Sequence, residues 1–162
     1  MLKNIDDETR AKFKEYAKLM SKSKYIITTD SPPEDTTKNI IVNGIKTKYT
    51  CDINGVITNA ETGRTIARHG PYPRNKQATH FIVINKKRCS IMTKRIIAAL
   101  FIPIPDKYKD IGQEYLTVYH KNRNYEDLST ENLGWYYRRD PDITKSDLPY
   151  YLKHTPSEIN TV

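Results

Sequence analysis

The chain has 162 residues, the length of one domain with room for an appended arm, which excludes a two-domain enzyme that carries its own cofactor fold. Hydrophobic residues make up 37% and charged residues 28%, so we expect a modest core and a polar surface. No apolar stretch approaches the about 20 residues that a bilayer-spanning helix needs, and the opening MLKNIDDETR lacks the apolar segment of a secretion signal. The sequence therefore predicts a cytoplasmic protein with no membrane partner.

The net charge of +8 comes from one segment of the chain. Residues 61–95 hold nine of the 27 basic residues and one of the 19 acidic residues, which leaves 18 of each sign elsewhere. Concentrated positive charge is what a polyanion binder needs, since each neutralised phosphate releases counterions. The alternative interpretation is a solvated strand face. The residues that we expect to contact DNA in the first case are Arg64, Arg68, Arg74, Lys76, Lys86, Lys87 and Arg88.

The first 24 residues are predicted to form a helix over residues 6–22. Asp6 or Asp7 can cap it, and an apolar stripe recurs at helical spacing through Phe13, Tyr16 and Met20. The stripe either packs on the body of the protein or binds a protein partner. Residues 25–39 are expected to be a linker or loop, because the stretch DSPPEDTTK within them has two prolines and no apolar side chain.

Residues 40–102 are predicted to form a basic antiparallel β module followed by a helix. The turn dipeptides Asn43-Gly44 and Asn54-Gly55 are each flanked by β-branched and aromatic residues. The helix is expected over residues 93–101, capped by Thr93 and stopped by Pro103. A further unit follows over residues 103–155, with a strand over residues 115–119, a polar loop and then the aromatic run at residues 135–137, and residues 156–162 form a tail. The fold class is therefore α+β.

Three segments resemble a known family. The segment TKRIIAALFIPIP, from Thr93 to Pro105, resembles the helix written VHRLVAxAFIPNP that precedes the nuclease motif of phage and intron HNH homing endonucleases. The segment VYHKNRNYEDLSTENLGW, from Val118 to Trp135, matches VNHIDGNKxNNxxxNLEW without a gap. Upstream, YTCDINGVI resembles the modular β segment that often accompanies these nucleases.

The resemblance implies a ββα-metal unit that hydrolyses phosphodiesters of duplex DNA, in the host cell of a phage or mobile element. His120 then stands at the position of the general base, Asn132 at that of the loop-pinning asparagine, and Trp135 at that of the core residue that closes the motif. A Mg²⁺ ion would polarise the scissile phosphate if the enzyme is active.

The usual metal ligands are missing from this motif. Tyr119 stands where the family has Asp or Asn, and Pro141 stands where the helix supplies a ligand. A neutral phenol is a poor partner for a hard cation, and proline has no side-chain oxygen. The oxygen-bearing side chains nearby that could replace them are Asn122, Asp127, Asp140 and Asp142.

The sequence leaves three functions open. The leading one is a DNA-binding protein of this family that has lost catalysis. The second is an active Mg²⁺-dependent nuclease or nickase that uses His120. The third is a protein-binding scaffold or inhibitor built on the same fold, with the N-terminal stripe at its contact surface.

Overall fold

The computed structural model describes residues 6–18, 22–71 and 77–140, and for residues 13–18 it describes the backbone alone. Within these residues the chain forms an α+β fold, which confirms the predicted class. The elements in chain order are α1 (Asp7–Lys18), β1 (Ile27–Thr28), β2 (Thr37–Val42), β3 (Ile45–Asp52), β4 (Ile57–Asn59), β5 (Thr79–Ile84), β6 (Lys87–Met92), α2 (Thr93–Phe101), β7 (Thr117–His120) and β8 (Leu133–Tyr136). Two short 3₁₀ turns, Asp106–Tyr108 and Gln113–Tyr115, join α2 to β7.

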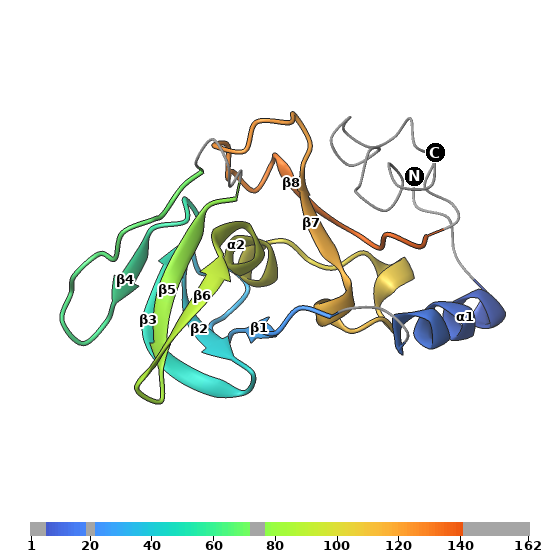
Figure 1. Cartoon of the computed structure of the whole chain (residues 1–162), viewed down its shortest axis with the longest axis horizontal. Coiled ribbons are helices and arrows are strands. Elements are labelled where there is room, and N and C mark those ends of the chain that lie inside the picture. Colours follow the sequence, from blue (N-terminus) through green and yellow to red (C-terminus); the bar gives the residue numbers. More distant parts are fainter. Residues whose placement is uncertain (1–5, 19–21, 72–76, 141–162) are drawn as a thin grey trace.

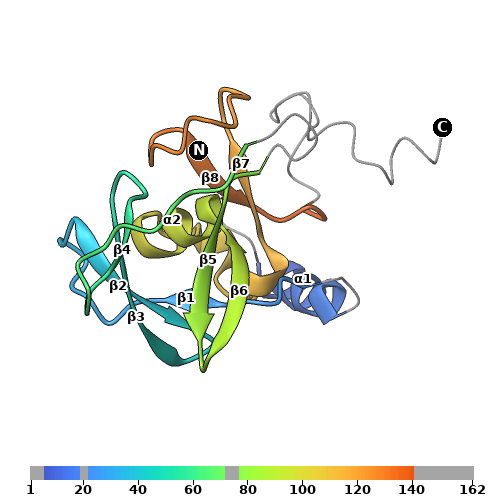
Figure 2. The ribbon, with the colours of Figure 1, turned by 60° about the vertical axis from the view of Figure 1, so that its left-hand side comes forward.

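Helix α2 lies at the centre of the molecule, between the four-stranded sheet and the hairpin β7–β8 (Figures 1 and 2). The sheet has the strand order β1-β2-β3-β4, and β5–β6 and β7–β8 are separate two-stranded hairpins, all antiparallel. Strands from all three groups contact α2. Its apolar residues Ile96, Ile97 and Ala98 are fully buried, so the core is built around this helix.

Two hairpins close on turns whose residues have left-handed backbones. Asn43 and Gly44, with φ of 51° and 79°, join β2 to β3, and Asn85 and Lys86, with φ of 50° and 64°, join β5 to β6. Positive φ at both central residues is the geometry that two-residue hairpins favour, because its twist matches that of the strands. The second turn places Lys86 and the first residues of β6 at an exposed hairpin end.

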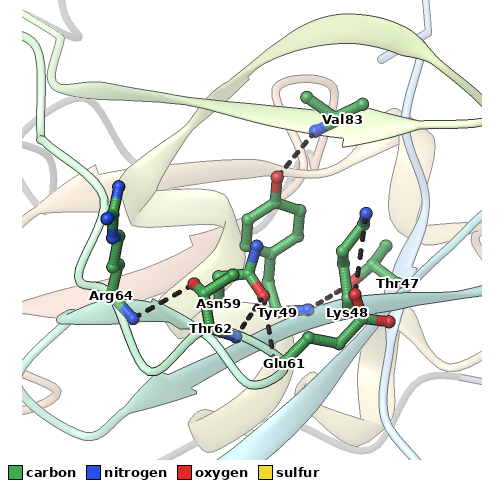
Figure 3. A network of polar contacts seen from close by, with 8 residues as sticks. All are labelled: Thr47, Lys48, Tyr49, Asn59, Glu61, Thr62, Arg64 and Val83. Carbon is green, nitrogen blue, oxygen red and sulfur yellow. Dashed lines mark hydrogen bonds and ion pairs between the residues drawn. The ribbon is translucent and has the colours of Figure 1, made fainter.

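A polar network joins the sheet to the hairpin β5–β6 (Figure 3). The backbone N–H of Val83 donates to the hydroxyl of Tyr49, at 3.4 Å, across the gap between β5 and β3. The side-chain oxygen of Asn59 accepts from the backbone N–H groups of Glu61 and Thr62, which fixes the turn after β4. The four-stranded sheet and the hairpin β5–β6 are therefore joined by the bond between Val83 and Tyr49 as well as by core packing.

The N-terminal helix is present, and it begins as predicted. The carboxylate of Asp6 accepts a hydrogen bond from the backbone N–H of Thr9 at 2.7 Å, the geometry of an N-cap. The side chains of the predicted stripe, including Phe13, Tyr16 and Met20, lie outside the described residues. None of the helices that the structure describes is long and apolar enough to cross a membrane.

The expected linker at residues 25–39 was wrong in part, because strand β1 lies within it and β2 begins at Thr37. Ile27 is buried, and its backbone N–H and C=O both bond to the side-chain amide of Gln113, at 2.8 Å each. A two-residue strand has no periodicity to detect, and its partner Gln113 lies 86 residues away in the sequence.

Helix α2 spans the predicted residues, but Thr93 does not cap it. The residue at the cap position is Met92, which makes no side-chain cap bond. The hydroxyl of Thr93 lies 2.7 Å from Nδ1 of the buried His80 instead. The side chain of Thr93, which the local sequence assigns to the helix cap, therefore bonds to a histidine of β5.

Candidate nucleic-acid interface

The hairpin β7–β8 carries the residues that resemble the nuclease motif. His120 ends β7 and pairs in register with Leu133 of β8. It is 1% exposed, and its ring lies 5.3 Å from the ring of Tyr125. The pKa of His120 is lowered to about 4, mainly by burial and also by the charge of Lys94, while Asp127 acts in the opposite direction. The imidazole is therefore neutral at pH 7, in the form that accepts a proton but with little basicity.

Asn132 holds the loop that connects the two strands. Its side-chain oxygen accepts from the backbone N–H of Asn122 at 2.8 Å, and its amide donates to the backbone oxygen of Asp127 at 2.8 Å. The backbone N–H of Lys121 donates to the backbone oxygen of Asn132 at 2.7 Å. One buried amide thus bonds to both halves of the loop.

The oxygen atoms of this loop bond to one another. Asn122 donates its amide to Asp127 at 2.8 Å, and its side-chain oxygen accepts from the backbone N–H of Asn124. The other carboxylate oxygen of Asp127 accepts from the backbone and hydroxyl of Ser129, and these bonds lower the pKa of Asp127. Both side chains, which the sequence offers as metal ligands, already act as turn-forming groups here.

Tyr119 and Gly134, two departures from the family pattern, are cross-strand partners. A Cβ added at Gly134 would lie 2.9 Å from Cε1 of Tyr119, so the ring of Tyr119 occupies the space of a side chain there. The ring also packs edge-on against Tyr136, with centroids 5.5 Å apart. Burial raises the pKa of Tyr119, which keeps the phenol neutral. Tyr119 and Gly134 therefore pack against each other at the position where the resemblance predicts a metal ligand.

The carboxylate of Asp140 is also occupied by polar contacts within the fold. Its carboxylate accepts a hydrogen bond from the hydroxyl of Tyr108 and forms an ion pair with Lys107, each at 2.5 Å, and its side chain is fully buried. Pro141 and Asp142 lie outside the described residues. Within the ranges that the structure describes, no three His, Cys, Asp or Glu side chains gather closely enough to hold a metal ion.

The basic residues predicted to contact DNA lie at two places. Lys86, Lys87 and Arg88 lie at the exposed end of the hairpin β5–β6, and the guanidinium of Arg88 lies 3.8 Å over the ring of Phe81. Such stacking holds an arginine in place and leaves its donors available. The other two, Arg64 and Arg68, follow β4, and Arg68 donates to the backbone oxygen of Gly55 at 3.4 Å. Arg74 and Lys76 lie outside the described residues.

Two adjoining pockets bring Lys87 and Arg88, which the sequence predicts to contact DNA, together with four cations that it did not indicate as ligand-binding residues: Lys24, Lys94, Arg95 and Arg138. One, of about 510 Å³, has Lys24, Lys87, Arg88 and Arg95 in its lining. The other, of about 240 Å³, has Lys94, Arg95 and Arg138 in its lining, with Glu114 as its acidic residue. Both share Ser23, Met92 and Arg95. The sequence signal for this site was the pair Lys94 and Arg95 in the first turn of α2. Cations are unfavourable at that end of the helix dipole, so such a pair indicates a bound anion.

Comparison with protein-family models gave no match. Comparison with curated proteins also gave none. Among solved structures, one described as "DNA binding and cleavage by the HNH homing endonuclease I-HmuI" is similar, with a TM-score of 0.49 and 16% sequence identity. The similar region covers 74% of this chain and 64% of that one, so the chain spans less than two thirds of the length of that structure.

Proposed function

We propose that this protein binds duplex DNA through an HNH-homing-endonuclease-like fold whose hairpin β7–β8 does not support metal-dependent cleavage. The observation that carries the binding part is the pair of adjoining pockets, which six cations line: Lys24, Lys87, Arg88, Lys94, Arg95 and Arg138. Glu114 is the acidic residue in their described lining. Four of them, Lys24, Lys87, Arg88 and Arg138, are exposed, and exposed cations gathered around adjoining pockets suit a phosphate backbone.

The loss of cleavage is inferred from the donor set. A Mg²⁺ ion needs several hard oxygen ligands at short distance. Tyr119 offers a neutral phenol packed over Gly134, Pro141 offers no side-chain oxygen, and the oxygens of Asn122 and Asp127 bond within the loop. These residues do not fit a magnesium site. His120 would then be a buried structural residue at the base position.

DNA binding is tested by fluorescence anisotropy with a labelled duplex over a range of salt concentrations. The triple variant Lys87→Ala, Arg88→Ala, Arg138→Ala should bind all sequences more weakly, and its salt slope should fall by about 0.9 for each phosphate that the variant no longer neutralises. The matched control removes the same charge from lysines that line neither of these pockets, Lys46, Lys48 and Lys109. If wild-type protein fails to bind duplex DNA at low salt, the protein-scaffold hypothesis takes its place.

Cleavage is tested on supercoiled plasmid with Mg²⁺ or Mn²⁺. We expect no nicking above background from wild-type protein or from His120→Ala, because no pair of ligands holds the cation against the phosphate. Metal-dependent nicking that His120→Ala abolishes would overturn this part of the proposal and establish the active nuclease instead. The DNA-binding part of the proposal would stand whatever the result of the cleavage test.

A further inference from the structure

Lys94, the second residue of α2, is a buried cation. The residue is 8% exposed, its side chain lines the pocket of about 240 Å³, and none of the described residues forms a hydrogen bond or ion pair with its ammonium. Burial and, to a smaller extent, the charge of Arg95 together lower the pKa of Lys94 to about 8. The ammonium is nevertheless protonated for the most part at pH 7. An unpaired buried charge is costly, and the fold gains nothing visible from it.

The helix end next to Lys94 lacks compensating negative charge. The sequence TKR at the start of α2 has no acidic residue, and the described residues supply no side-chain cap at Met92. The first turn of a helix carries the positive end of the dipole and N–H groups that favour anions. In α2 the N–H group of Thr93 already donates to the backbone oxygen of Ala78 at 3.0 Å, so the first-turn N–H groups that face the pocket are those of Lys94 and Arg95. Two cations in this turn therefore increase a positive potential that nothing on the helix itself offsets.

Arg95 is fixed beside Lys94 by two hydrogen bonds, and its Nε–H group is unpaired among the described residues. One terminal nitrogen donates to the backbone oxygen of Leu116 at 2.7 Å, and the other donates to that of Gln113 at 2.9 Å. The Nε–H group is buried and has no hydrogen-bond partner among the described residues. Buried polar atoms are almost always paired, so an unpaired N–H beside an unpaired ammonium indicates a missing acceptor.

Both side chains line the pocket of about 240 Å³, together with Arg138 at its exposed rim. Since water occupies about 30 Å³ in the liquid, the pocket has room for an oxyanion with several waters. The carboxylate of Glu114 lies over Gly112, where an added Cβ would collide with it. The pocket thus presents three cations and one carboxylate, with a helix N-terminus among its walls.

We propose that this pocket is a phosphate site in which Lys94, the first turn of α2 and Arg138 hold one phosphodiester of the bound duplex. This inference rests on the proposed DNA-binding function for the source of the phosphate. The chemistry of the pocket itself is that of an oxyanion site. Lys94 supplies the desolvated charge, and Arg138 at the rim reaches the same group from the solvent side.

The site is tested first with inorganic phosphate, at constant ionic strength against chloride, by following the Arg95 Nε–H and first-turn amide signals of α2 in NMR spectra. Wild-type protein should show saturable shifts. Lys94→Met, which keeps the length of the side chain and removes the charge, should lose them, and Arg138→Ala should weaken them. Lys109→Met, which removes an exposed lysine that does not line the pocket, should retain them.

The second measurement is the affinity for a duplex as a function of salt. Lys94→Met should bind about tenfold more weakly, the loss expected for one charged hydrogen bond, and its salt slope should fall by about 0.9. Folding of each variant is checked from its amide spectrum, and Arg138→Ala, at an exposed residue, provides a variant whose folding is not at risk.

The outcomes separate the two proposals. If DNA binds but Lys94→Met and Arg138→Ala change neither phosphate binding nor the salt slope, the phosphate site is wrong and the DNA-binding function stands. If wild-type protein binds no DNA but Lys94→Met abolishes saturable phosphate binding, the oxyanion site stands and the DNA-binding function is wrong. If wild-type protein shows no saturable phosphate shift, the site is wrong whatever the DNA result.

Discussion

The two ends of α2 each hold a buried lysine, and only one of them is paired within the described residues. At the C-terminal end, Lys38 from β2 donates to the backbone oxygen of Leu100 at 2.8 Å and lies 5.1 Å from the ring centroid of Phe101. At the N-terminal end, none of the described residues forms a hydrogen bond or ion pair with the ammonium of Lys94. A cation is favourable where helix carbonyls are free and unfavourable where helix N–H groups are free. The charge of Lys38 therefore stabilises the fold, whereas we assign the charge of Lys94 to ligand binding.

The largest expected effect on stability is at Lys38, at the C-terminal end of α2. Lys38→Met removes a charged hydrogen bond and leaves the Leu100 carbonyl buried without that donor, so it should lower the free energy of unfolding by about 3 kcal/mol. Urea denaturation at pH 7 measures this loss. A change below about 0.5 kcal/mol, the size usual for a surface substitution, would show that Lys38 does not cap the helix.

A gain in stability is expected at Lys94, at the N-terminal end of α2. Lys94→Met keeps the packing of the side chain and removes the unpaired charge, so it should raise the free energy of unfolding by about 2 kcal/mol at pH 7. A loss of stability instead would mean that the ammonium has a structural partner. The same denaturation experiment makes the measurement, and Lys38→Met is its matched control.

The gain at Lys94 should depend on pH. The pKa of Lys94 falls from 10.5 to about 8 on folding, so between these pH values the unfolded chain holds more protons than the folded one, and wild-type stability rises with pH. Below pH 8 both states are protonated and the full cost of burial is present. The advantage of Lys94→Met should therefore be constant below pH 8 and shrink toward pH 10.5. An advantage of equal size at pH 7 and pH 10 would contradict the assignment.

A smaller effect is expected at His120. Burial is the main cause of its low pKa, and the charge of Lys94 adds to it. Lys94→Met should therefore raise the pKa of His120 above its present value of about 4 while leaving it below the ordinary 6.5. NMR titration of the imidazole measures this shift. Lys38→Met, at the far end of α2, should leave the titration unchanged, and an equal shift in both variants would indicate a general loosening of the core.

The sequence predicted the fold better than it predicted the site. Hairpin turns and α2 depend on local signals, such as Asn43-Gly44 and the apolar spacing through Ile96 and Ile97, and these appear where expected. Strand β1, which pairs with β2, was missed because two residues show no periodicity and because the side chain that bonds to Ile27, that of Gln113, lies far along the chain. The pinning bonds of Asn132 follow the motif, but the packing of Tyr119 over Gly134 depends on cross-strand register. Lys94 was counted for its charge alone, since burial and missing partners cannot be read from composition.

The smallest expected effect is the coupling between the two ends. Helix α2 has nine residues and is therefore about 13 Å long, and in the described structure no residue bonds to both Lys38 and Lys94. Substitutions this far apart usually add within about 0.5 kcal/mol. The double variant Lys38→Met, Lys94→Met should accordingly be destabilised by the difference of the two single effects, about 1 kcal/mol at pH 7. A coupling above about 1 kcal/mol would show that the helix dipole or a shared core rearrangement links the lysines. The charge at Lys94 would then belong to the folding of α2, and the reason to assign it to a phosphate would weaken.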